Sequence, residues 1–210
     1  MPIEWLLSEP LFFIAWIVAI LVTLTIHEFS HALAAAYFGD QTAKKAGRLT
    51  LNPLVHIDPL GFMMLLFAGF GWAKPVPVNP YNFKNHRLAM GVVSLAGPLA
   101  NLAAVIVFGL IFKFAAPFWG FDNLLPNFLY LLILVNVALF IFNLVPIPPL
   151  DGSKVLFSIL PDKFNDFKEK FSEYGPYILL ILVVIDSFTN IGIFSYLFTG
   201  IKDLTAWLFF

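Results

Sequence analysis

The stretch from Ile14 to Phe38 is long and apolar enough to cross a lipid bilayer, yet it contains two histidines and a glutamate within five residues. A membrane-spanning helix needs about 20 apolar residues, and ionisable side chains inside such a helix are costly and usually functional. His27, Glu28 and His31 lie in the segment TIHEFSHAL. The stretch therefore predicts a membrane helix that carries a chemical site.

The composition also indicates a membrane protein. Hydrophobic residues make up 60% of the 210 residues and charged residues 12%, whereas a soluble domain is about 45–50% apolar and about 25% charged. The net charge of -1 offers no basic surface for nucleic acid, so no such partner is expected. Cysteine is absent, so a zinc site would have to use imidazole and carboxylate ligands.

Four stretches are long and apolar enough to span a membrane. We expect an all-α polytopic membrane protein, forming a single membrane-embedded domain, with spans at roughly 11–38, 88–114, 126–148 and 174–198. The N-terminal tail has no basic residue, unlike a cleavable signal, so the first span is expected to be retained.

Two other apolar stretches are too short or too interrupted to span. The piece from Phe62 to Gly71 is about half the required length and is flanked by proline and glycine, which predicts a re-entrant or interfacial segment. The stretch Ile193–Phe210 is broken by Gly200, Lys202 and Asp203. It predicts a short amphipathic helix on the membrane surface.

The basic residues indicate an orientation, because cytoplasmic loops are enriched in lysine and arginine. They follow the first span (Lys44, Lys45, Arg48, Lys74, Lys84, Arg87) and the third (Lys154, Lys163, Lys168, Lys170). The loop between the second and third spans has only Lys113 at its edge. We therefore expect a multi-pass protein of the cell membrane, with its N-terminus outside and the histidine pair in the cytoplasmic half of the first span.

His27 and His31 are four residues apart, so on a helix both project from one face and can bind one ion. Glu28 lies beside that face. This HExxH pattern combines two imidazole ligands for zinc with a carboxylate that can take a proton from water. Polar packing against a neighbouring helix is the alternative, but ionisable residues in a span favour a functional role.

A catalytic zinc needs a third protein ligand, and six residues could supply it: His56, Asp58, His86, Asp122, Asp151 and Asp186. The orientation places Asp122 outside and Asp186 near the middle of the bilayer. Asp151, in NLVPIPPLDGSK, follows the third span at about the depth of the histidines.

Charge also favours Asp151, because zinc(II), Asp151 and Glu28 together sum to zero in a low-dielectric site. Asp151-Gly152 could instead be only a turn. His56 and Asp58 remain the rival ligands. They could also shape a turn between prolines, as His86 could be a solvated interfacial residue.

Four motifs resemble the site-two protease family of intramembrane zinc metalloproteases, and they reach over nearly the whole chain: HEFSH at 27–31, GWAKPVPVNP at 71–80, SLAGPLAN at 94–101 and NLVPIPPLDG at 143–152. The resemblance is to the minimal bacterial or archaeal form without a PDZ or CBS domain. It implies that His27, His31 and Asp151 bind zinc, that Glu28 is the general base, and that Asn143 lies near the scissile peptide.

Two of these motifs leave alternatives open. The prolines of GWAKPVPVNP favour an extended chain that could pair with an unwound substrate, or simply a loop; the resemblance implies a membrane-associated β-hairpin here that includes GRLTL at 47–51. In SLAGPLAN, Gly97 and its small neighbours favour close helix packing. Asn101 could face the site or only pack, and Asn143 could have a structural partner or contact the substrate.

The sequence thus predicts a zinc endopeptidase that hydrolyses a peptide bond in or near a transmembrane segment, in regulated intramembrane proteolysis. Its expected partners are the lipid bilayer and a transmembrane or membrane-anchored protein substrate, and no oligomeric state is indicated. A zinc-binding transporter or sensor is the alternative function. It would need further ligands across the bilayer, and none occurs on the outer halves of the spans.

Overall fold

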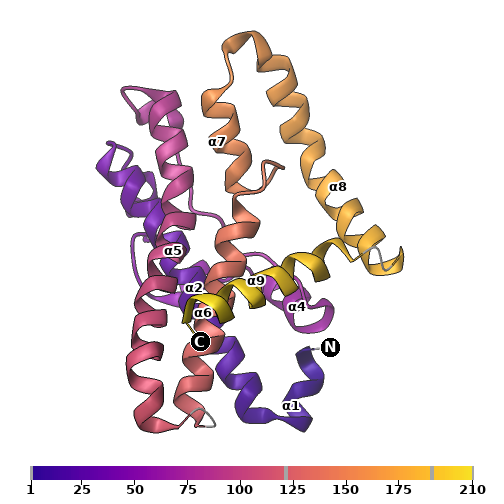
Figure 1. Cartoon of the computed structure of the whole chain (residues 1–210). Helices are drawn as coiled ribbons and strands as arrows, with labels where there is room; N and C mark the ends of the chain where they lie inside the picture. The colour runs from indigo at the N-terminus through magenta and orange to yellow at the C-terminus, as the bar shows by residue number, and fades with distance from the viewer. Residues whose placement is uncertain (1, 121–122, 190–191, 210) are drawn as a thin grey trace.

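The computed structural model describes residues 2–120, 123–189 and 192–209. Within these residues, three helices are long and apolar enough to cross a membrane. They lie in α2 (Pro10–Tyr37), α5 (His86–Trp119) and α6 (Leu124–Asn143) and pack together as the body of the molecule (Figure 1). The chain is therefore a mostly helical, multi-pass membrane protein.

Two predicted spans match the observed helices closely, and the third is shorter than expected. Helix α6 ends at Asn143 rather than at residue 148, because the proline-rich segment that follows cannot continue a helix. After this break, α7 (Asp151–Ile159) begins at the aspartate of the last motif.

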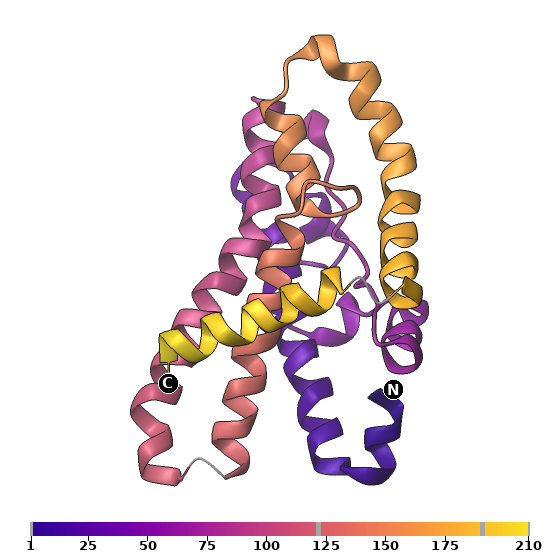
Figure 2. The same cartoon turned by 45° about the vertical axis from the view of Figure 1, so that its right-hand side comes forward.

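The predicted fourth span at 174–198 is not confirmed. Helix α8 (Asn165–Thr189) starts with a charged first half, so its apolar half is shorter than the roughly 20 residues that a bilayer requires. Residues 190–191 lie outside the described part of the chain. Helix α9 (Ile193–Phe209) then crosses α6 (Figure 2), with Ile201 and Thr205 buried.

The predicted β-hairpin is not confirmed either. Among the described residues, β-pairing is limited to an isolated antiparallel bridge between Ile57 and Ala73. Residues 47–51 contain turns and bends and no strand. Pro75 and Pro77 cannot donate hydrogen bonds to a ladder. The short apolar segment does form a helix too short to span, α4 (Pro59–Ala68).

The remaining elements are short. They are α1 (Trp5–Ser8), α3 (Thr42–Lys45) and 3-10 turns at Pro2–Glu4, Pro53–His56, Pro80–Asn82 and Asp162–Phe164.

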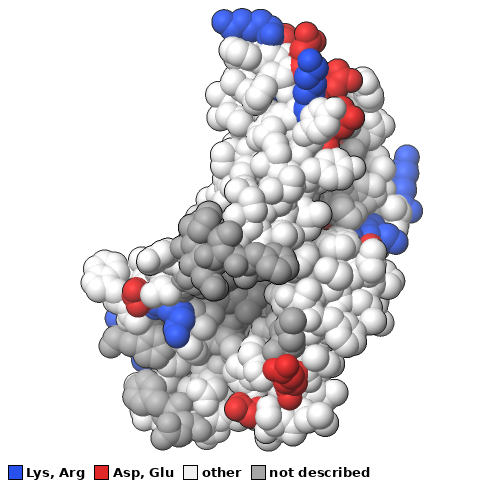
Figure 3. Space-filling model, turned by 90° about the vertical axis from the view of Figure 1, so that its right-hand side faces the viewer, with Lys and Arg blue, Asp and Glu red and all other residues white. Residues whose placement is uncertain are grey.

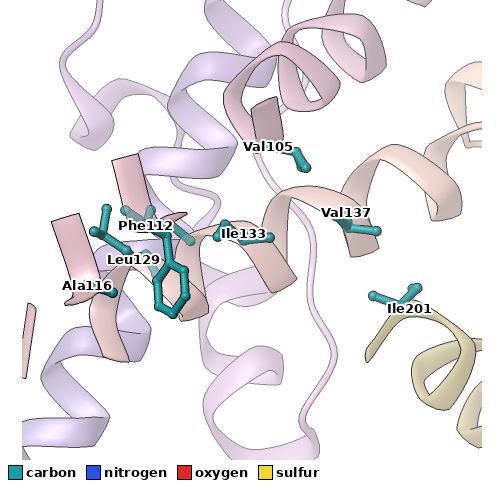
Figure 4. Close-up of a cluster of buried hydrophobic side chains, with 9 residues drawn as sticks. Val105, Phe112, Ala116, Leu129, Ile133, Val137 and Ile201 are labelled. Carbon is teal, nitrogen blue, oxygen red and sulfur yellow. The ribbon is translucent and has the colours of Figure 1, made fainter. Parts of the chain in front are cut away.

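Apolar side chains fill the contact between α5, α6 and α9. Figure 4 shows Phe112 of α5 beside Leu129 and Ile133 of α6, and Ile201 approaching from α9. On the surface, charged side chains gather at the end where α7 leads into α8, and the described surface below carries fewer charges, at its sides and at the opposite end (Figure 3). This distribution suits a chain whose middle contacts lipid.

Helix α7 is fastened to the start of α5. Arg87 of α5 donates hydrogen bonds to the carbonyls of Ser158 (3.3 Å), Ile159 (3.2 Å) and Leu160 (2.6 Å) at the end of α7. Cations at a helix C-terminus satisfy its free carbonyls. This attachment sets where Asp151, the first residue of α7, lies relative to α2 and α5.

Candidate metal centre

His27 and His31 of α2 meet Asp151 of α7 in a buried group. The Oδ2 atom of Asp151 lies 3.1 Å from His27 Nε2 and 3.0 Å from His31 Nε2, and the two Nε2 atoms are 3.1 Å apart. Tetrahedral zinc with bonds of about 2.0–2.2 Å separates its ligand atoms by roughly 3.3 Å. These three residues form the one group of potential metal ligands found among the described residues.

The opposite ring nitrogens show which atoms are free to bind a metal. His27 Nδ1 lies 2.6 Å from Asn101 Oδ1, and His31 Nδ1 lies 2.7 Å from the carbonyl of Val93. Both oxygens are acceptors, so each Nδ1 carries the proton and each Nε2 keeps a lone pair. Two such nitrogens and a carboxylate oxygen converge on one point, which is the donor arrangement that fits zinc.

Gly97 of α5 makes room for the two rings. A Cβ atom at this position would lie 2.4 Å from His31 Nε2 and 2.7 Å from His27 Cε1. The backbone of α5 can therefore approach the imidazoles only because residue 97 has no side chain. The sequence predicted close helix packing at SLAGPLAN. The structure shows that α5 packs at this point against the histidine pair of α2.

Behind His27, a chain of buried polar side chains continues into the bundle. Asn101 donates to Asn136 Oδ1 (2.9 Å), and Asn136 donates to Thr23 Oγ1 (2.8 Å). All three side chains are fully buried. Asn101 thus faces the site. The sequence reasoning missed Asn136 and Thr23, whose signal was a polar residue within an apolar span.

Glu28 lies on the open side of the group. Its Oε2 accepts a hydrogen bond from the backbone N–H of Val76 (3.1 Å). The carboxylate lines a cavity of about 480 Å³ together with both histidines, Asp151, Asn143 and part of segment 71–78. A cavity of this size can admit a peptide segment as well as water.

Asn143 borders this cavity but is not among the three converging residues. Its Nδ2 donates to the carbonyl of Leu139 one turn earlier (3.1 Å). The amide therefore has a structural partner, and its contact with a substrate stays a prediction.

The rival ligands lie elsewhere. His56 Nε2 donates to the carbonyl of Thr50 (2.9 Å), and the Asp58 carboxylate caps α4 by accepting from Gly61 N–H (2.8 Å). His86 Nδ1 donates to the carbonyl of Pro80. Asp186 is outside the ligand group, and Asp122 lies outside the described residues.

Lys154 was missed by the sequence reasoning. Its Nζ donates to Asp151 Oδ1 (3.1 Å), one turn along α7. This bond leaves Oδ2 directed at the histidines, which favours binding through one oxygen. It also adds a positive charge that the charge argument for a neutral zinc site had left out. The case for Asp151 as a ligand therefore rests on its position beside the histidines, not on the sum of charges.

Comparisons with known proteins identify the family. The model of peptidase family M50 matches residues 119–185. YwhC of Bacillus subtilis, named as a candidate zinc metalloprotease, is 43% identical over 175 residues, which cover 80% of this chain and 79% of the relative. The chain belongs to peptidase family M50.

Two further relatives carry similar names. Rip2 of Mycolicibacterium smegmatis is 34% identical over 82% of this chain and 67% of its own length. MJ0611 of Methanocaldococcus jannaschii is 30% identical over 79% of this chain and 80% of its own. No solved structure matches the chain.

Membership of family M50 confirms the resemblance to site-two proteases that the motifs indicated. It makes this chain a metallopeptidase with zinc as its cofactor. The three residues that converge in the structure, His27, His31 and Asp151, have the donor types that such a zinc requires.

Proposed function

We propose that this M50 peptidase cleaves a peptide bond within or beside a transmembrane segment of a membrane-protein substrate. The observation that carries the proposal is the position of the ligand group. Its histidines lie in the second half of α2, a helix long enough to span the bilayer, and Glu28 faces a cavity beside them. A soluble substrate would not require catalytic residues on a membrane helix.

The chain's residues divide the chemistry between them. Bound zinc supplies Lewis-acid chemistry and lowers the pKa of water towards about 7. Glu28 takes a proton from the attacking water and returns it to the amine that leaves when the C–N bond breaks. Asn143, at the cavity wall, is proposed to donate a hydrogen bond to the carbonyl oxygen as it gains negative charge.

The substrate has to enter in an extended form, because the carbonyls of a helix are held in its own hydrogen bonds. Segment 71–78 borders the cavity outside any helix. Its prolines favour an extended backbone, which would suit pairing with an unwound substrate. Helix-breaking residues near the cleavage site would lower the cost of unwinding.

The membrane placement is part of the proposal. We propose a cell-membrane protein with its active site on the cytoplasmic side, as the basic residues indicate. The apolar half of α8, whose Ile178, Leu180, Ile181 and Val184 are exposed, would contact lipid. Regulated release of a membrane-anchored protein is the process that such a reaction serves.

The alternative, a zinc transporter or sensor, is less well supported. Transport across a bilayer needs successive ligand groups along a path. The described residues contain one such group.

Substituting Glu28 tests the proposal. Glu28→Gln should keep zinc bound but lower cleavage of a transmembrane test peptide by about 100-fold to 10,000-fold, the usual contribution of general acid–base catalysis. Zinc content and cleavage rate would be measured on purified protein in lipid vesicles.

Glu169→Gln, at an exposed glutamate of α8, is the matched control and should cleave at the wild-type rate. Undiminished cleavage by Glu28→Gln would remove Glu28 from its role. Failure of the wild-type, zinc-loaded protein to cleave would contradict the proposed function itself.

A further inference from the structure

Arg48 lies outside the ligand group, yet it is connected to Glu28 through one stretch of backbone. Its side chain is buried, with 6% exposed. The guanidinium donates hydrogen bonds to the carbonyl of Pro75 (3.2 Å) and to that of Lys74. The next N–H along the chain, that of Val76, donates to Glu28 Oε2 (3.1 Å).

The connection follows from the geometry of a single peptide unit. The carbonyl of Pro75 and the N–H of Val76 belong to the same planar trans peptide, so they point in opposite directions. When Arg48 holds the carbonyl on one side, the N–H is directed to the other side, where Glu28 lies. The neighbouring prolines, Pro75 and Pro77, have no N–H of their own, so Val76 is the donor available at this point.

Arg48 is itself held in place. His56 Nε2 donates to the carbonyl of Thr50, which leaves its Nδ1 as an acceptor 3.4 Å from Arg48 Nη2. The carbonyl of His56 accepts from the N–H of Lys74 (2.9 Å). His56 therefore contacts both Arg48 and the segment that Arg48 binds.

A buried guanidinium is costly unless its hydrogen bonds are well used. Here two of its nitrogens bind consecutive carbonyls, which the rigid fork of arginine can do and a lysine ammonium cannot match in the same geometry. The Arg48 Nε is buried without a partner among the described residues. Burying this charged group would cost more free energy than a simple packing contact would return, which favours a specific role for Arg48.

We propose that Arg48 is a positioning residue for Glu28. It orients the Pro75–Val76 peptide so that the Val76 N–H holds the carboxylate in the direction of the water it deprotonates. Arg48 touches neither the substrate nor the zinc. The inference rests on the proposed function, because it assigns Glu28 the role of general base.

Two substitutions of Arg48 test this role in the purified full-length protein in lipid vesicles. Arg48→Gln should lower kcat by about tenfold to 100-fold, the effect of losing charge-assisted hydrogen bonds. Arg48→Lys should fall between this variant and wild type. Zinc content should stay at the wild-type level, and KM should change by less than about threefold, because neither ligands nor substrate contacts are altered.

A second measurement is independent of activity. Amide hydrogen exchange, followed on the peptide that contains Val76, should be faster in both Arg48 variants than in wild type. Lys45→Gln, which removes an exposed positive charge nearby, is the control and should change neither kcat nor this exchange.

The outcomes separate the possible roles. A lower zinc content with unchanged kcat per zinc-loaded molecule would mean a structural role and overturn the proposal. A raised KM at unchanged kcat would assign Arg48 to substrate binding and overturn it as well. Wild-type kcat and wild-type hydrogen exchange in both Arg48 variants would contradict this inference alone. An inactive wild-type protein would contradict the proposed function. In that case, unchanged hydrogen exchange in the Arg48 variants would still reject the positioning role of Arg48.

Discussion

The two sides of the metal centre are built differently. On the inner side, which faces the packed helices, His27 is held by a chain of hydrogen-bonded side chains. These are Asn101, Asn136 and Thr23, all fully buried. On the outer side, which faces the cavity, Glu28 is held by the backbone N–H of Val76, in the proline-rich segment 71–78 that Arg48 supports. The inner side fixes a proposed ligand within packed helices, while the outer side fixes the proposed base at the edge of a cavity.

This difference suggests a division of work. A ligand needs a constant orientation, which a network between rigid helices provides. The base has to be placed and also leave space for the substrate, which a segment of backbone at the cavity wall allows. Changes on the inner side should therefore alter zinc affinity, and changes on the outer side should alter turnover.

The largest effect is expected where both sides meet, at Asp151. Asp151→Ala removes one of the three proposed ligands, so zinc affinity should fall by more than the about 10–100-fold typical of changes outside the ligand set. Competition with a chelator would measure it, and Asp166→Ala, at an exposed position of α8, is the control. Unchanged affinity would return the search for the third ligand to other residues.

An intermediate effect is expected from the inner side. Asn101→Ala leaves His27 Nδ1 without its acceptor, so zinc affinity should fall about 10–100-fold. The same competition assay applies, with the exposed Asn127→Ala as control. If Asn101→Ala bound zinc normally and lost only turnover, the two sides would not differ in the way described.

The smallest effect is expected at Asp40, which accepts a hydrogen bond from the backbone N–H of Asn79 (2.7 Å), just after segment 71–78. Burial acts to raise the pKa of this carboxyl, but hydrogen bonds from Thr42, Asn79 and Asn82 outweigh burial and lower the pKa below its ordinary value of 3.8. A lowered folded-state pKa stabilises the protein at pH values above about 4, and this contribution is lost as the pH falls through the folded-state pKa.

Asp40→Asn should therefore melt at a lower temperature than wild type near neutral pH, and the gap should shrink as the pH falls below about 4. Thermal unfolding followed by tryptophan fluorescence would measure it, with zinc content expected to stay unchanged. A gap that is constant or widens in acid would contradict this account of Asp40.

Much of this arrangement could be predicted from the sequence. The apolar stretches located α2 and α5, because a bilayer requires long helices. The HExxH spacing predicted that His27 and His31 lie together, because residues four apart share a helix face. The depth of Asp151 predicted that it joins this group of potential metal ligands. Those signals are local in the sequence or depend only on the length of an apolar stretch, so they can be recognised without knowledge of the fold.

The rest depends on contacts between distant segments. The hairpin expected at 47–51 and 71–80 is not confirmed, because the carbonyls of Lys74 and Pro75 bind the Arg48 side chain. Asn136 and Lys154 gave no spacing pattern that linked them to the histidines. A basic residue counted for orientation, Arg48, proved to be a buried hydrogen-bond donor.

The missing side chain at Gly97 has a practical consequence. An alanine there would add one methyl group and alter no charge, yet that group would occupy space now taken by an imidazole ring. Such a chain would keep His27, Glu28, His31 and Asp151 in the sequence while losing the shape that gathers them. A check of the HExxH pattern and Asp151 alone would not register the change.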